Sequence, residues 1–171
     1  SLPLGIKLLA GVAGITGSKS KGIEDLRDAG AHGVISSVEA RTALGLFLRR
    51  EARYDEAIVV TRTLTEQYPR DFLFRLELAN LTKDAGEGPA AIKQYQQLIE
   101  QAKKSGYFPS ARLELAWFGL GDTLQGQKNY AEAAEAYNQA TAQPTISVDL
   151  KSRCDLNSGK MYDLLNERDM A

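Results

Sequence analysis

Leu115 to Ala140 reads LAWFGLGDTLQGQKNYAEAAEAYNQA, and this stretch holds the clearest pattern in the chain. Two antiparallel helices approach closely only where their side chains are small. Gly121 in the first half and Ala133 in the second half therefore mark a predicted helix crossing. Large residues fill the gaps beside it: Trp117, Leu120 and Tyr137. The stretch predicts a helical hairpin.

The turn of this hairpin is predicted at Gly126 to Asn129. Asn is a favoured N-cap residue, and Asn129 stands directly before the second helical segment. Glu132, three residues later, is placed to reach back toward the backbone of Asn129, as in a capping box. We therefore expect Asn129 to cap the second helix.

The same pattern occurs twice more upstream. Ala57 follows Leu44-Gly45 at the interval that separates Ala133 from Leu120-Gly121, and Ala91 lies 34 residues after Ala57. The interval from Ala91 to Ala133 is 42 residues, which predicts a longer second helix running to about Lys104, a break at 105–109 and a helix start at Pro109. The chain therefore contains repeated helical hairpins.

Both ends carry weaker copies. At the N-terminus, Leu9-Ala10 marks a crossing, Gly17 a turn and Gly22-Ile23 a second helix. At the C-terminus, Ser158-Gly159 marks a first helix, and a turn is expected from Asn166 to Asp169, so the chain stops within a unit. We predict one domain, 1–171, with units at about 2–37, 38–71, 72–113, 114–147 and 148–171, the last incomplete.

The spacing of Trp, Leu-Gly, Ala and Tyr in these units resembles the tetratricopeptide repeat. The resemblance covers nearly the whole chain, is strong for 38–71 and 114–147, and implies about four to five units. It implies an all-α fold, a right-handed superhelical array of antiparallel helix pairs that binds proteins in a concave groove. Arg41 and Arg75 stand at the Trp position, and Thr61 replaces the usual aromatic residue, which suggests looser packing there.

The resemblance also implies which residues line the groove, because they stand at set offsets from the Leu-Gly pair. Leu76 and Phe118 are expected to be central, since apolar and aromatic anchors usually dominate binding energy. The predicted groove residues are Thr42, Leu46, Arg49, Leu73, Leu76, Asn80, Lys83, Leu115, Phe118, Asp122, Gln125 and Lys160. This lining predicts an apolar helical or extended segment as ligand, from a partner or a neighbouring copy.

A carboxylate clamp, by which chaperone-binding members of the family grip a C-terminus, is absent. Such a clamp needs Lys, Asn, Asn, Lys and Arg in five positions. Those positions hold Thr42, Leu46, Glu77, Leu115 and Gly119. We therefore do not expect recognition of a terminal carboxylate.

The composition favours a soluble, folded chain. Of 171 residues, 43% are hydrophobic and 25% charged, and 21 basic against 22 acidic residues leave a net charge of −1. This balance disfavours nucleic acid as a partner. No apolar run is long enough to span a bilayer. A single Cys allows no internal disulfide, and the compartment stays open between cytoplasm and periplasm.

Isolated reactive residues give little support to catalysis. Gly11 to Ser20 lacks the spacing of a phosphate-binding loop, because Ser18 separates Gly17 from Lys19. His32 is expected in a solvated loop, and Cys154 is expected to pack in the interior. We predict no catalytic, cofactor-binding or metal-binding residues and no cofactor.

Three functions compete at this stage. A protein-interaction scaffold leads, because stacked hairpins make a continuous binding surface. An enzyme would need convergent polar groups, which the sequence does not supply. The alternative is a membrane-surface or self-associating module acting through the apolar segment Leu2 to Ile15, and the uncapped end of the array allows a homo-oligomer.

Overall fold

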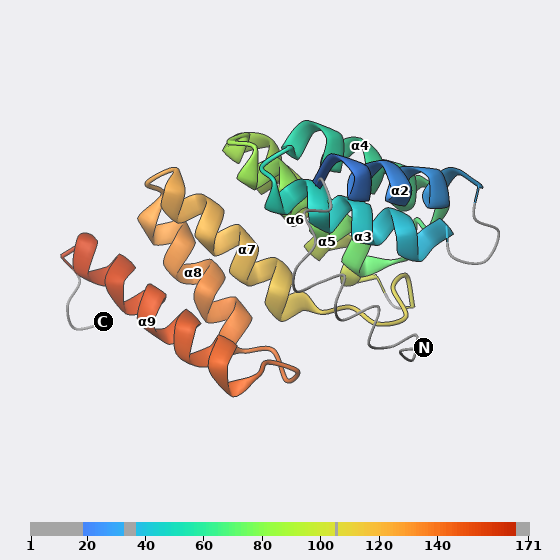
Figure 1. The fold of residues 1–171 in the computed structure, drawn as a ribbon. Coiled ribbons are helices and arrows are strands. Elements are labelled where there is room, and N and C mark those ends of the chain that lie inside the picture. The colour runs from blue at the N-terminus through green and yellow to red at the C-terminus, as the bar shows by residue number, and fades with distance from the viewer. Residues whose placement is uncertain (1–18, 33–36, 105, 167–171) are drawn as a thin grey trace, which may run out of the picture.

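The computed structural model describes residues 19–32, 37–104 and 106–166. Within these ranges the chain forms eight helices and no strand, so the predicted all-helical fold is confirmed (Figure 1). The helices are α2 (Lys19–His32), α3 (Ser37–Arg50), α4 (Tyr54–Gln67), α5 (Phe72–Asp84), α6 (Gly88–Ala102), α7 (Leu113–Gly126), α8 (Tyr130–Thr141) and α9 (Val148–Leu164).

Each helix packs against the next one along the chain, which produces an array from α2 at one end to α9 at the other (Figure 1). The predicted hairpins are α3 with α4, α5 with α6, and α7 with α8. Among the first helices of these hairpins, α5 also contacts α7. The predicted elements at 2–17 lie outside the described residues.

The crossings of the hairpins are closely packed. Ala57, Ala91 and Ala133 of the second helices are completely buried. A Cβ atom added at Gly121 would lie 2.8 Å from the ring of Tyr137. Because Gly121 has no side chain, it leaves room for Tyr137, which lies one helical turn after Ala133. Both helices of the hairpin therefore contribute a small residue to the crossing.

The arginines at the expected Trp position form a repeated hydrogen-bonded clamp. Arg41 donates from Nη1 to Gln67 Oε1 (2.8 Å), and Arg75 donates in the same way to Gln101 Oε1 (2.8 Å). The Nε of each arginine donates to a backbone carbonyl that precedes its helix, at 3.0 and 2.9 Å. Each arginine thereby joins the two helices of its hairpin, so these departures leave the fold intact.

The turns inside the hairpins share one backbone geometry. Ala52, Gly86 and Lys128 have positive φ angles of 56°, 87° and 64°. The next backbone N–H in each case donates to the carbonyl five residues earlier, as in a Schellman motif. Asn166, where the last turn is predicted, has a φ of 60°.

The predicted side-chain cap of α8 is wrong. Asn129 does occupy the N-cap position, but its side chain makes no capping hydrogen bond. The turn is closed through the backbone instead, because Asn129 N–H donates to Leu124 O at 3.0 Å. Gly126 is the last residue of α7 rather than part of the turn.

The 42-residue interval is absorbed by a loop and not by a longer helix. α6 has 15 residues against 14 in α4, residues 103–104 and 106–112 are not helical, and α7 starts at Leu113 and not at Pro109. Phe108 of this loop is buried and packs edge-on against Phe72, with ring centroids 5.4 Å apart. This contact draws the loop back to the start of α5, which keeps Pro109 out of the helix.

Glu114 links α7 to the loop before α9. Its side chain is completely buried and accepts hydrogen bonds from Arg112 Nε and, at 2.8 Å, from Thr145 Oγ1. Burial alone would raise the pKa of this carboxyl group, but its hydrogen bonds and the positive charge of Arg112 together outweigh burial, and the pKa lies below its ordinary value. The ionised form of Glu114 therefore stabilises the folded chain.

Replacing Glu114 with Gln is expected to lower the free energy of unfolding at pH 7 by roughly 1–3 kcal/mol, the range for hydrogen bonds to charged groups. Because the folded pKa is depressed, this contribution is complete above the unfolded pKa and is lost as the pH falls through the folded pKa. Urea unfolding of both proteins at pH 7 and at pH 3 measures it. A difference that stays the same at pH 3 would contradict the assignment.

Candidate functional site

A hollow of about 270 Å³ lies between α3, α4 and α5. Five of the predicted groove residues surround it: Thr42, Leu46, Leu73, Leu76 and Asn80. The other lining residues are Gly45, Thr61, Leu64, Phe74 and Glu77. The structure therefore brings five of the seven α3 and α5 members of the predicted set together around one space, and Arg49 and Lys83 do not line it.

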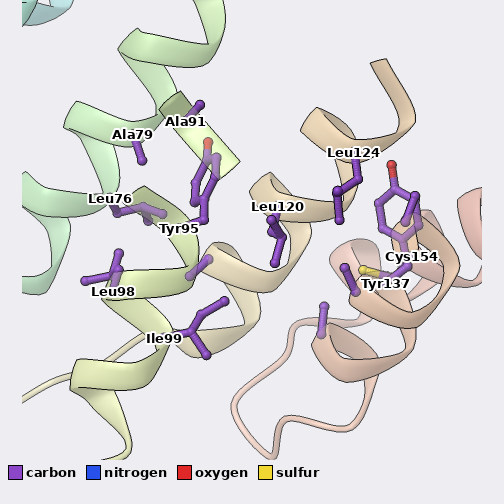
Figure 2. Close-up of a cluster of buried hydrophobic side chains, with 14 of the residues drawn as sticks. Leu76, Ala79, Ala91, Tyr95, Leu98, Ile99, Leu120, Leu124, Tyr137 and Cys154 are labelled. Carbon is purple, nitrogen blue, oxygen red and sulfur yellow. The ribbon is translucent and has the colours of Figure 1, made fainter. Parts of the chain in front are cut away.

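The hollow coincides with the hairpin that has Thr61 in place of the usual aromatic residue of the second helix. In the other two hairpins the equivalent position holds Tyr95 and Tyr137, both completely buried. Figure 2 shows their hydroxyl ends pointing the same way, each beside the first helix of its hairpin. Tyr95 donates to Asn80 Oδ1 (2.6 Å), and Tyr137 donates to Asp122 Oδ1 (2.8 Å). Thr61 is too short to fill the corresponding space.

The mouth of the hollow is apolar and accessible. Leu46 from α3 and Leu73 from α5 are 55% and 53% exposed. Deeper in, Leu64 and Leu76 are buried. Exposed apolar side chains above an apolar hollow are typical of a surface that binds another molecule.

Charged residues link α3 to α5 on the same face. Arg49 donates through Nη1 to Glu77 (3.0 Å) and through Nε to Asp84 (2.8 Å), and Lys83 Nζ lies 3.6 Å from Asp84 Oδ1. Burial alone would lower the pKa of Arg49, but the Glu77 and Asp84 carboxylates outweigh it and raise the pKa. Arg49 and Lys83, both predicted groove residues, are thus already paired within the chain.

The predicted residues on α7 are also engaged in internal contacts. Phe118 lies beneath the guanidinium of Arg153, 4.5 Å from Cζ to the ring centroid, and against the ring of Tyr137. Asp122 and Gln125 both accept from the Tyr137 hydroxyl, at 2.8 and 2.7 Å.

The two remaining predicted residues lie apart from the hollow. Leu115 is partly buried against the core, and Lys160 is exposed on α9. The α7 and α9 members of the predicted set therefore do not line the hollow of α3 and α5.

Several hollow residues were missed as groove residues. Gly45, Leu64 and Phe74 line the space, but they do not stand at the offsets that the family resemblance supplies. The departure at Thr61 from the aromatic pattern is the one sequence signal that points to this place. The others follow only from the packing of three helices.

Other candidate residues have structural roles. His32 is the last residue of α2, with Nδ1 2.9 Å from Asp28 Oδ1, so its predicted loop position is wrong. Cys154 is completely buried, as predicted, and burial raises the pKa of its thiol.

The described residues contain neither a cluster of metal ligands nor a helix that could span a membrane. Within 19–32, 37–104 and 106–166, no group of three or more His, Cys, Asp or Glu residues could hold a metal ion. Among the helices described, none has the length and apolarity to cross a membrane. Leu2 to Ile15 and residues 11–18 of the stretch Gly11 to Ser20 lie outside these ranges.

Comparison with known proteins finds a family match for part of this chain and similar solved structures. Residues 114–143 match the tetratricopeptide repeat family. The crystal structure of BtubC (BKLC) from P. vanneervenii is similar at 15% sequence identity and a TM-score of 0.49, covering 90% of this chain and 84% of that one. No curated protein matches. The match at 114–143 and the sequentially packed helices of the described residues together fit a tetratricopeptide-repeat protein.

Proposed function

We propose that this chain is a protein-interaction scaffold that binds an apolar helical or extended segment of a partner protein on the face formed by α3 and α5. Tetratricopeptide repeats are a non-catalytic protein-interaction domain, which supports the general class of function. The location of binding is our inference from the side chains of this face.

One observation carries this location. Five predicted groove residues surround a single apolar hollow, and two of them, Leu46 and Leu73, leave more than half of their surface in water. Covering such leucines with a partner removes apolar area from water, worth about 25 cal/mol per Å² before the costs of association. The α7 part of the predicted groove offers less apolar surface to a partner, because the guanidinium of Arg153 already lies over the ring of Phe118.

The exposure of each leucine determines whether its substitution can test binding without also unfolding the chain. Leu76, predicted as a central anchor, is only 6% exposed, so Leu76→Ala would cost roughly 2–5 kcal/mol of stability by opening a cavity. Loss of binding in that variant would be ambiguous. Leu46 and Leu73 are exposed, so replacing them changes the surface and spares the core.

The experiment uses a displayed library of random 12-residue peptides selected on the full chain. We expect the double variant Leu46→Asp and Leu73→Asp to bind the enriched peptides at least tenfold more weakly, because charge at the mouth opposes apolar burial. The matched control is Val148→Asp with Leu156→Asp, which places two carboxylates at exposed positions on α9. Equal binding by the α3–α5 variant and wild type would overturn the proposed location.

A further inference from the structure

We infer that the hollow between α3, α4 and α5 receives one uncharged aromatic side chain of the bound segment, with phenylalanine preferred over tyrosine. This inference rests on the proposed function and names the chemistry of the partner at that site.

The origin of the hollow shows what shape fits it. At the equivalent position of the other two hairpins, the rings of Tyr95 and Tyr137 stand beside the first helix (Figure 2). A glycine Cβ would lie 2.8 Å from the Tyr137 ring at Gly121, whereas at Gly45 the nearest atom is Thr61 Oγ1 at 3.4 Å. The α3–α4 hairpin therefore keeps the glycine beside which the α7–α8 hairpin places the Tyr137 ring, but it has Thr61 in place of that ring.

The size of the space agrees with such a guest. The hollow measures about 270 Å³, and an apolar cavity of roughly 150 Å³ in another protein is large enough to hold benzene. The chain's own helices therefore leave room for a phenyl group that enters between Leu46 and Leu73.

The charge around the hollow argues against an ionised guest. Glu77 is the one ionisable residue among its lining residues. Both Glu77 carboxylate oxygens accept from Arg49 Nη1 at 3.0 Å, so this charge already has a partner. A lysine or glutamate side chain would lose its hydration on entering and gain no free counter-charge.

The walls favour a phenyl ring over a phenol. In the neighbouring hairpins the residue after the crossing is Asn80 or Asp122, and each accepts the tyrosine hydroxyl. The equivalent residue of the α3–α4 hairpin is Leu46, whose side chain has no hydrogen-bond acceptor. Leu64 and Leu76 continue the apolar wall, and Phe74 adds an aromatic contact for an incoming ring.

The first test uses toluene, p-cresol and methylcyclohexane as probes in amide NMR titrations of the full chain. Toluene is expected to give saturable shifts at Gly45, Thr61 and Leu64 and to bind more tightly than the other two. Equal binding of methylcyclohexane, or shifts located elsewhere, would overturn the inference. This mapping uses the wild-type chain and needs no substitution.

The second test fills the hollow from inside. Thr61→Phe is expected to abolish the toluene shifts, because its ring would occupy the space. Val59→Phe, on the same helix at a position that is 62% exposed and does not line the hollow, is the matched control and should bind toluene as wild type does. Full toluene binding by a folded Thr61→Phe protein would overturn the assignment.

The peptide library separates the two levels of the proposal. Enriched peptides are expected to contain one phenylalanine whose change to alanine weakens binding at least tenfold, and Thr61→Phe should lose them. Enriched peptides without an aromatic residue that still bind Thr61→Phe would overturn this inference and leave the proposed function standing. A selection that yields no binding peptide would overturn both.

Discussion

Replacing Tyr95 with Thr is expected to lower the free energy of unfolding by roughly 3–5 kcal/mol, the range for removing a large buried aromatic side chain. Tyr95 is completely buried between α5 and α7, and its hydroxyl donates to Asn80. The change removes the ring and leaves Asn80 without that donor. Urea unfolding followed by circular dichroism measures the loss.

The same substitution should create a second binding space for toluene, because it reproduces at α6 the residue that stands at Thr61. The control is Tyr68→Thr, since Tyr68 is 43% exposed and its loss should cost less than about 1 kcal/mol. Two results would contradict the account of the hollow. One is equal destabilisation by both changes, and the other is a folded Tyr95→Thr protein that gains no toluene site.

Adding one methyl group is expected to have opposite effects at two equivalent glycines. In Gly121→Ala the new Cβ would lie 2.8 Å from the ring of Tyr137. That ring is completely buried, and its hydroxyl donates to Asp122 and Gln125. The ring therefore cannot shift away from the new methyl group without losing these contacts. The overpacking should cost roughly 1–3 kcal/mol, against a gain of at most about 1 kcal/mol in helix propensity, so the net change is expected to be destabilising.

In Gly45→Ala the nearest atom, Thr61 Oγ1, lies 3.4 Å away, which is an ordinary contact. The helix-propensity gain then stands alone, and the free energy of unfolding should rise by up to about 1 kcal/mol. Thermal and urea unfolding of both variants beside wild type decide the comparison. Changes of the same sign and size at the two glycines would show that the rings do not account for the packing.

The hairpins themselves could be predicted from the sequence because their pattern is local. Crossing residues such as Gly121 and Ala133 lie within one hairpin, and the hydrophobic spacing on each side has the period of a helix. The hydrogen bonding of the turns was harder to predict from the sequence. Asn129 has the residue type of a cap, but a competing backbone hydrogen bond to Leu124 closes the turn without its side chain.

The path of residues 106–112 depended on residues that are distant in sequence. A proline at 109 is compatible with a helix start, yet the burial of Phe108 against Phe72 holds this segment as a loop. The arginine clamps are of the same kind, since Arg41 and Arg75 find their glutamine partners 26 residues later. Only packing brings such partners together.

The repeat, the hairpin crossings and the missing ring at Thr61 follow from the sequence by itself, since each is read by aligning one unit with the next. Only the tertiary structure decided that the missing ring leaves a hollow. The hairpin crossings and the Arg49 bridge from α3 to α5 hold the surrounding helices in place. Close-packed helices tied in this way do not collapse around one short side chain, so the volume of the absent ring remains as space.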